Sequence, residues 1–361
     1  MSKLLVYFSQ EMKKVDYIIV GSGLAGISFC ETLKQHKKSF VVVDDGSQQT
    51  SAIAGGLYNP IILKRFTKTW KAEEQLEIAL PLYAKLEKEL EVILDYKTPV
   101  YRLFASVEEQ NNWFEASDKP ALSKYLSTEL LKNISPYIKN DFGFGKVLNT
   151  GRIDTGLLVS KYKKHLKKEE MLLKETFDFK ALQIKNSSII YNDYEAKQIV
   201  FAEGFGLKHN PFFNYLPLDG TKGELITIHA PNLKIDYVLK SSVFLIPLGD
   251  DLYRLGATYD WKDKTTETTL SGKQELLNKL KRFLKCDFTI VNHIAGIRPT
   301  VNDRRPLIGK HPKYNNIYVL NGLGTRGVMI GPYVSRELYN HIELQKPLEK
   351  EIDINRYSKL Y

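Results

Sequence analysis

The sequence predicts an α/β protein of two domains, one of them built from separate segments of the chain around a second domain with a mixed or antiparallel sheet. Three observations predict this. A strand–glycine turn–helix–strand unit opens the chain at residues 17–44, and a strand–glycine turn–helix closes it at residues 317–344. Between them, residues 222–259 form short apolar runs with the hairpin signal Gly-Asp-Asp at 249–251. Similar units at both ends of a β-rich block indicate a discontinuous domain.

The opening unit contains each part of a Rossmann-like dinucleotide fingerprint. The apolar strand 17–20 runs into the turn GSGLAG, which opens a helix, and a second apolar strand ends on Asp44. Gly21 permits the tight turn, and Gly23 lets a pyrophosphate approach the helix N-terminus, where free N–H groups favour an anion. Gly26 stands where helix and strand pack closest. Asp44 is placed to accept hydrogen bonds from a ribose diol.

The other elements follow from periodicity. Amphipathic spacing predicts helices at 70–92, 107–117, 153–166, 270–284 and 328–344. Apolar runs predict strands at 100–105, 188–191, 198–202, 224–229, 243–248, 252–259, 288–291 and 317–320. Pro81 predicts a kink or break in the first of these helices, and Asp154 or Thr155 is the expected N-cap of the third.

These elements are divided between two predicted domains. The dinucleotide-binding domain is expected to take residues 13–75, 140–215 and 290–361, and the substrate domain residues 76–139 and 216–289. Residues 1–12 are expected to be an N-terminal extension, because Met12 would itself be an ordinary start for a fingerprint protein.

Composition narrows the class of protein. The 361 residues are 43% hydrophobic and 26% charged, as in ordinary globular proteins. No apolar run approaches the ~20 residues needed to span a bilayer, so no membrane association is expected. Only Cys30 and Cys286 are present, which predicts a reducing, cytoplasmic location and leaves too few thiols for a zinc or iron–sulfur site. The net charge of +10 fits a solvated lysine-rich surface, or a basic face for an anionic partner such as nucleic acid.

Several blocks together resemble the FAD-dependent D-amino acid oxidase family, in its glycine oxidase and sarcosine oxidase branch. The blocks occur in family order over roughly residues 13–345, at 21–26 with Asp44, 55–56, 150–155, 201–204, 222–225, 255–258, 296–299 with 303–309, and 322–327. The last two blocks are the most specific, whereas the first is shared with most Rossmann-type flavoproteins.

The resemblance implies FAD with its ADP half on the opening unit and its flavin between the domains. The turn at 324–327 would bring helix N–H groups towards the flavin N1–C2=O2 edge, where reduction places negative charge. The FAD contacts implied are Gly21, Gly23, Leu24, Ala25, Gly26, Asp44, Asp45, Gly55, Gly56, Ala202, Gly204, Gly324, Thr325, Arg326, Gly327 and Val328. Neither cysteine lies in a matching block, so non-covalent FAD is expected.

The family reaction implied is oxidation of the C–N bond of a small amine or amino acid, by hydride transfer to flavin N5 and hydrolysis of the imine. Arg298 is the first candidate for a clamp on a substrate carboxylate, because its planar guanidinium binds such a group through two hydrogen bonds. The alternative for Arg298 is an ion pair with a neighbouring acid. Arg326 is a second candidate that serves either the substrate or FAD. Phe244 stands where several relatives have a tyrosine, which leaves the particular substrate open.

Two other functions stay open. The turn GLGTRG at 322–327 also resembles the oxidase half of the bacterial enzyme that matures a wobble uridine of tRNA, and the charge of +10 fits such a partner. A flavoprotein dehydrogenase that passes electrons to a partner protein is the other possibility. The sequence decides neither the electron acceptor nor the oligomeric state.

Overall fold

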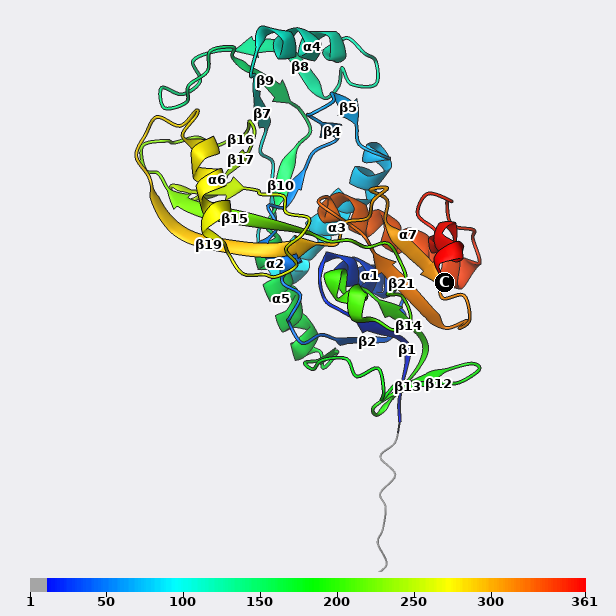
Figure 1. Cartoon of the computed structure of the whole chain (residues 1–361). Coiled ribbons are helices and arrows are strands. Elements are labelled where there is room, and N and C mark those ends of the chain that lie inside the picture. The colour runs from blue at the N-terminus through cyan, green and yellow to red at the C-terminus, as the bar shows by residue number, and fades with distance from the viewer. Residues whose placement is uncertain (1–11) are drawn as a thin grey trace, which may run out of the picture.

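Two eight-stranded sheets organise the chain. The computed structural model describes residues 12–361, so the expected extension at 1–12 lies outside the described residues except for Met12. In Figure 1 the first sheet lies at the lower right, around β1 and α1, and the second lies at the upper left, with α4 and α6 beside it. The predicted α/β class, with sheets of mixed orientation, is confirmed.

The first sheet is centred on the fingerprint strand β1 (Lys13–Val20), which runs parallel to β2 (Phe40–Val43) and β14 (Tyr194–Phe201). Its other strands are β11 (Leu172–Leu173), β12 (Gln183–Ile184), β13 (Ile189–Tyr191), β20 (Leu307–Lys310) and β21 (Ile317–Asn321). β21 runs parallel to β14, so the closing unit of the chain returns to the sheet that the opening unit starts. The inner strands are continuous apolar runs because both faces of a parallel sheet are covered.

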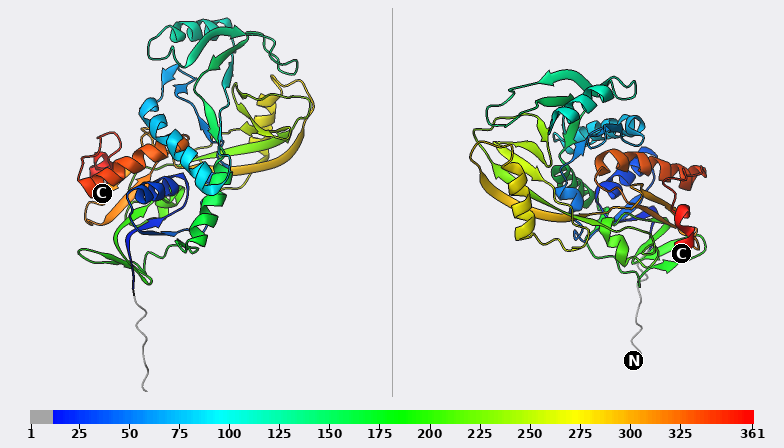
Figure 2. Two further views of the ribbon diagram at one scale, coloured as in Figure 1. Left: turned by 180° about the vertical axis from the view of Figure 1, so that it is seen from behind. Right: turned by 45° about the horizontal axis from the view of Figure 1, so that its top comes forward.

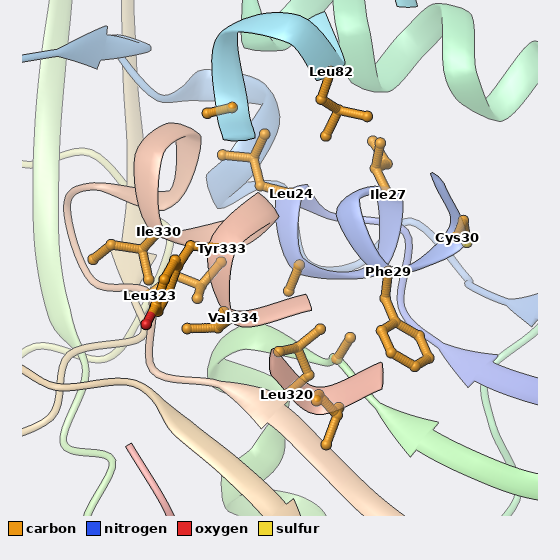
Figure 3. Close-up of a cluster of buried hydrophobic side chains, with 14 of the residues drawn as sticks. Leu24, Ile27, Phe29, Cys30, Leu82, Leu320, Leu323, Ile330, Tyr333 and Val334 are labelled. Atoms are coloured by element: carbon orange, nitrogen blue, oxygen red, sulfur yellow. The ribbon is translucent and has the colours of Figure 1, made fainter. Parts of the chain in front are cut away.

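Two helices pack on one face of this sheet and against each other, α1 (Leu24–Gln35) and α7 (Gly327–Leu344), and α3 (Ala72–Leu90) packs against α7. Figure 3 shows Leu24 and Ile27 of α1 in one buried cluster with Leu82 of α3 and Val334 of α7. α3 continues past Pro81, so the chain does not break there. The helix that opens at the glycine turn is thus held rigidly at the edge of the sheet.

The second sheet is long and mostly antiparallel. Its strands, in spatial order, are β19 (Thr289–Arg298), β15 (Thr221–His229), β18 (Leu252–Gly256), β17 (Phe244–Gly249), β16 (Val238–Lys240), β7 (Val100–Leu103), β9 (Phe144–Val147) and β8 (Leu126–Leu131). α6 (Leu270–Leu280) packs against β15 and β18, and α4 (Val107–Ser117) packs against β8. The views in Figure 2 show this sheet extending away from the first sheet along the paired strands β15 and β19.

The remaining elements are short, apart from α5. They are α2 (Thr50–Ile53), α5 (Thr155–Lys168), β3 (Leu57–Tyr58), β4 (Ile61–Ile62), β5 (Thr67–Lys68), β6 (Asp95–Tyr96), β10 (Gly151–Ile153), and the 3₁₀ helices η1 (Gly204–His209) and η2 (Ile354–Leu360). The Asp154 carboxylate caps α5 by accepting from Leu157 N at 3.0 Å, which decides between the two expected caps. Within residues 12–361, no helix has the length and apolarity needed to cross a membrane.

β19 differs most from its prediction. The expected strand at 288–291 continues to Arg298, because its register with β15 runs from Thr289 opposite His229 to Arg298 opposite Thr221. Polar residues along this edge strand hide the run in the sequence. β9 and β19 both pair in the second sheet, although they fall in the segments 140–215 and 290–361 expected for the first domain. The domain boundaries themselves stay a prediction.

Candidate active site

A cavity of about 630 Å³ opens where the carboxyl ends of β1, β2, β14 and β21 meet the second sheet. Ligand sites in α/β proteins lie at such strand ends, and volumes of ~300–1,000 Å³ suit small molecules. We call the part lined from 20–25, 43–48, 175–179 and 202–206 the fingerprint end. The part lined from β15, β16, β17 and β19 is called the sheet end.

The cavity brings together nearly all the residues that the sequence singled out. Arg298 lines it, and so do Gly21, Gly23, Leu24, Ala25, Asp44, Asp45, Gly55, Gly56, Ala202, Gly204, Gly324, Thr325, Arg326, Gly327 and Val328. Gly26 does not line it. A Cβ on Gly26 would lie 1.9 Å from the carbonyl oxygen of Gly21, so this glycine is needed for the close packing of α1 on β1.

Two glycines keep the start of α1 open to the cavity. Gly21 has φ +102°, and a Cβ there would lie 2.6 Å from the carbonyl oxygen of Ala202. A Cβ on Gly23 would lie 2.9 Å from Ser51 Oγ, the oxygen that accepts from Leu24 N at 3.1 Å. The missing side chains leave a concave backbone surface in front of a helix N-terminus, the arrangement that binds a pyrophosphate.

The carboxylate of Asp44 is fully hydrogen-bonded by the protein. Oδ2 accepts from Ser22 N at 2.7 Å and Ser22 Oγ at 2.9 Å, and Oδ1 accepts from Gly46 N at 2.8 Å and Lys163 Nζ at 2.7 Å. A carboxylate has about four acceptor positions, so a ribose hydroxyl would take the place of one of these donors. Asp45 beside it accepts from Ser47 N at 2.8 Å.

Glu203 is a third acid at the fingerprint end, which the sequence analysis passed over between Ala202 and Gly204. Its carboxylate lines the cavity and accepts from Asn210 Nδ2 at 2.7 Å. Burial raises the pKa of Glu203 to about 7, against a smaller opposing effect of the Asn210 hydrogen bond. Glu203 lies in the resemblance block 201–204, but its burial at the start of η1 could not be read from that block.

The loop at 55–56 and the start of α7 form the middle of the cavity. Gly56 has φ +67°, and a Cβ there would lie 1.9 Å from the carbonyl oxygen of Ile153, so this loop is fixed against the start of α5. Gly324, with φ +57°, turns the chain out of β21, and α7 begins at Gly327. The first backbone N–H groups of α7 therefore lie at the cavity wall, as the sequence predicted for this turn.

Arg298 dominates the sheet end. Its Nη1 lies 3.4 Å from Lys222 O and 3.3 Å from Thr258 O, and its guanidinium lies over the ring of Tyr259 at 4.5 Å. The guanidinium also covers Gly223, where a Cβ would be 2.0 Å from Nη2. Within residues 12–361 it makes no ion pair, which argues against the alternative of a neighbouring acid. Burial lowers the pKa of Arg298 because the charged form loses hydration.

Besides the exposed Lys64, two partly buried cations line the cavity without an acidic partner among the described residues. Arg326, at the N-cap of α7, has its pKa lowered by burial, with Arg304 and Arg305 adding a like-charge effect. Lys240, on β16, was not predicted from the sequence. Its Nζ lies 5.6 Å from the centre of the Phe244 ring, and burial lowers its pKa to about 8. A lone lysine on a strand gives no signal in the sequence.

Comparison with known proteins decides the family. The family model described as FAD dependent oxidoreductase (DAO) matches residues 16–340. The chain belongs to this family. This FAD-dependent oxidoreductase is 24% identical to glycine oxidase of Bacillus subtilis (strain 168). The match covers 87% of the present chain and 89% of that glycine oxidase. The crystal structure of glycine oxidase from Geobacillus kaustophilus has a TM-score of 0.78 at 17% identity, covering 96% of this chain and 98% of that one.

A second kind of relative matches a smaller part. The tRNA 5-methylaminomethyl-2-thiouridine biosynthesis bifunctional protein MnmC of Legionella pneumophila (strain Corby) is 25% identical over 41% of this chain, and the match spans 27% of that longer protein.

FAD is the cofactor of the family, and the residues of this FAD-dependent oxidoreductase fit it. The glycine cradle at 21–23 is a space that a Cβ would fill, and it faces the N-terminus of α1. The N-terminus of α7 faces the same cavity from the other side. The resemblance seen in the sequence, and the FAD dependence that it implied, are confirmed.

Proposed function

We propose that this FAD-dependent oxidoreductase oxidises the C–N bond of a small amine or amino acid. When bound, FAD supplies the hydride acceptor at flavin N5, so the substrate loses a hydride from its α-carbon and a proton from nitrogen, and water hydrolyses the imine. Glycine oxidases among the relatives support this reaction class. Non-covalent FAD is part of the proposal.

The fingerprint end would hold the ADP half of FAD. Gly21, Gly23 and the start of α1 supply the backbone surface for the pyrophosphate, and Asp44 is the proposed partner of the ribose. The N-terminus of α7 at Gly327 would stabilise the electron-rich edge of the flavin, because helix N–H groups favour negative charge.

Arg298 is the residue from which we infer that the substrate has a carboxylate. A partly buried guanidinium without an acidic partner among the described residues favours an anionic ligand, because an unpaired charge removed from water is costly. A substrate carboxylate held there by two hydrogen bonds would fix the α-carbon in one place, so the clamp contributes orientation as well as affinity.

Anaerobic bleaching of the flavin tests the proposal. The purified protein is expected to be yellow, to release FAD on acid precipitation, and to lose its flavin absorbance with at least one member of a panel of amino acids and N-methyl amino acids. Colourless protein, or flavin that stays with the precipitate, would contradict the cofactor assignment. Flavin that none of the amines reduces would contradict the reaction class.

A tRNA-directed amine oxidation is the second candidate, supported by the net charge of +10 and by the bifunctional tRNA-modifying relatives. A gel shift with tRNA at several salt concentrations separates the two, because binding through lysine and arginine weakens steeply with added salt. Reduced flavin that O₂ does not reoxidise would instead favour a dehydrogenase with a protein partner.

A further inference from the structure

Lys240 lies on the same sheet face as the Arg298 clamp. It stands directly opposite Phe244 on β17, Phe244 stands opposite Gly256 on β18, and Gly256 stands opposite Leu225 on β15. Residues opposite one another in an antiparallel ladder share a face. Two positions along β15 lies Gly223, which the guanidinium of Arg298 covers. Because side chains alternate along a strand, Gly223 and Leu225 also share that face.

The Lys240 ammonium has no counter-charge from the protein. Among residues 12–361, its Nζ makes no hydrogen bond and no ion pair. Its neighbours add to the positive charge, since Arg102 and Lys279 both act on it as like charges. Glu109, the acid nearest to Arg102 in the hydrogen-bond network, is already bonded to that arginine and to Ala105 N.

The acids that line the cavity lie elsewhere. Asp44, Asp45, Glu175 and Glu203 are all at the fingerprint end, and each is hydrogen-bonded there. Below the ammonium is the apolar ring of Phe244, where the hydroxyl of a tyrosine would have offered a partner. A partly buried ammonium that lies over an aromatic ring and has no acidic partner among the described residues favours an anionic ligand.

We infer that Lys240 binds a second anionic group of the substrate, and that the enzyme therefore acts on amines with two carboxylates. This rests on the proposed function of the same site. One carboxylate lies on Arg298, the amine and α-carbon lie between the two cations, and the distal carboxylate lies on Lys240.

The separation of the two cations fits a short substrate. Gly223 is three strands from Lys240 and two residues along β15 from the row that contains Lys240, and the ammonium lies towards the Phe244 ring. About two strand spacings across and two residues along the strand give roughly 12 Å between the cations. Two charge-assisted contacts of ~2.8 Å leave roughly 6 Å between the carboxylate oxygens. That is the reach of a short amino dicarboxylate. A second cavity of about 760 Å³ shares Lys240 and Lys64 with the first, and Glu108, Glu109 and Glu115 also line it.

Isosteric pairs test the inference. Aspartate against asparagine and glutamate against glutamine, in both enantiomers, differ at the distal group by one charge. The acid is expected to exceed its amide in kcat/KM by about 30-fold, the scale of one charge-assisted hydrogen bond. Lys240→Met should bring this ratio within about 3-fold, and Lys240→Arg should retain most of the preference.

Binding gives a readout that is independent of turnover. Succinate and glutarate are unreactive, and each is compared with its monoamide through the change in flavin absorbance of the holoenzyme. The diacid is expected to bind about 30-fold more tightly than the monoamide, and this preference should be lost in Lys240→Met. If no amine reduces the flavin but this preference holds, the proposed reaction fails and the anion site stands.

Other results overturn the inference. Equal kcat/KM for acid and amide in the parent protein removes the second anion site, even if both reduce the flavin. Loss of the preference in Lys64→Met, with Lys240→Met unaffected, assigns the distal group to the other lysine. Retention of tRNA that weakens in Lys240→Met, with no diacid preference, means that the anion is a phosphate of nucleic acid.

Discussion

The two ends of the cavity treat charge in opposite ways. At the fingerprint end each acid has its own protein donors, four of them on Asp44 alone. At the sheet end Arg298 and Lys240, and in the middle of the cavity Arg326, have no acidic partner among the described residues. A surface with its charges paired suits a ligand that stays in place, whereas unpaired buried cations favour a ligand that brings its own charge. The difference separates a proposed cofactor surface from a proposed substrate surface.

Removal of the unpaired cation Arg298 is the change with the largest expected effect on the sheet end. Arg298→Leu is expected to lower kcat/KM for a carboxylate substrate by ~2–4 kcal/mol, because the substrate charge would then be buried without a partner. Fold and FAD content should be unchanged, since no acid among residues 12–361 pairs with this arginine. Steady-state kinetics and the flavin spectrum measure both.

Arg298→Lys is the matched variant. It keeps the charge but not the planar pair of donors, so it should recover only part of the loss. Full turnover of a carboxylate substrate by Arg298→Leu would rule out the clamp and make Arg326 the next candidate.

Glu203 tests the fingerprint end, because burial raises the pKa of this carboxyl from 4.5 to about 7. The Glu203 carboxyl holds its proton more tightly in the folded protein than in the unfolded chain. The free energy of unfolding is therefore highest below pH ~4.5 and falls as pH rises through 7. At 1.36 kcal/mol for each pKa unit, the loss at pH 8 is at most about 3 kcal/mol. Glu203→Gln removes this penalty and should raise the free energy of unfolding at pH 8 but not at pH 4.5.

Urea unfolding of the parent and Glu203→Gln at the two pH values measures this difference. Glu74→Gln, at an exposed position of α3, is the control and should change stability equally little at both. A Glu203 variant that behaves like this control would show that the carboxylate is ionised at little cost in the folded protein.

Asp44 gives the smallest expected effect. Asp44→Ala should weaken FAD by ~1–3 kcal/mol, the scale of a charge-assisted hydrogen bond. Lys163→Met removes one of the four donors on that carboxylate and should cost FAD affinity less than ~1 kcal/mol, because the ion pair is partly exposed. Fluorescence of FAD titrated into the apoprotein measures both. Equal losses of FAD affinity in Asp44→Ala and Lys163→Met would mean that Asp44 contributes to FAD binding only through its ion pair with Lys163.

The sequence predicted those features of the fold that depend on residues close together in the chain, namely the glycine turns and a helix cap. The glycine turn at 21–26 and the turn at 324–327 were identified because positive φ and missing side chains leave a mark in the sequence itself. Asp154 was one of two expected caps for the same reason, since a cap depends on neighbours in the chain.

Features that depend on strand pairing were missed. β19 was predicted too short, because its length comes from its register with β15 and not from its own apolar content. Lys240 gave no signal, since only the fold places it over Phe244. Glu203 lay in the resemblance block 201–204, but only the fold places its carboxylate against Asn210. Arg298 was found through its resemblance block, but its freedom from an ion pair could be seen only once its surroundings were assembled.

Gly223 determines where the guanidinium of Arg298 can lie at the sheet end. The guanidinium of Arg298 occupies the space that a methyl group at this position would fill, 2.0 Å from Nη2. Alanine at 223 would displace the cation along the sheet without removing its charge. The missing side chain at this position of β15 therefore leaves the space that the proposed clamp on the substrate carboxylate occupies. One carbon added at Gly223, which itself lines the cavity, would move that clamp without any new charged residue.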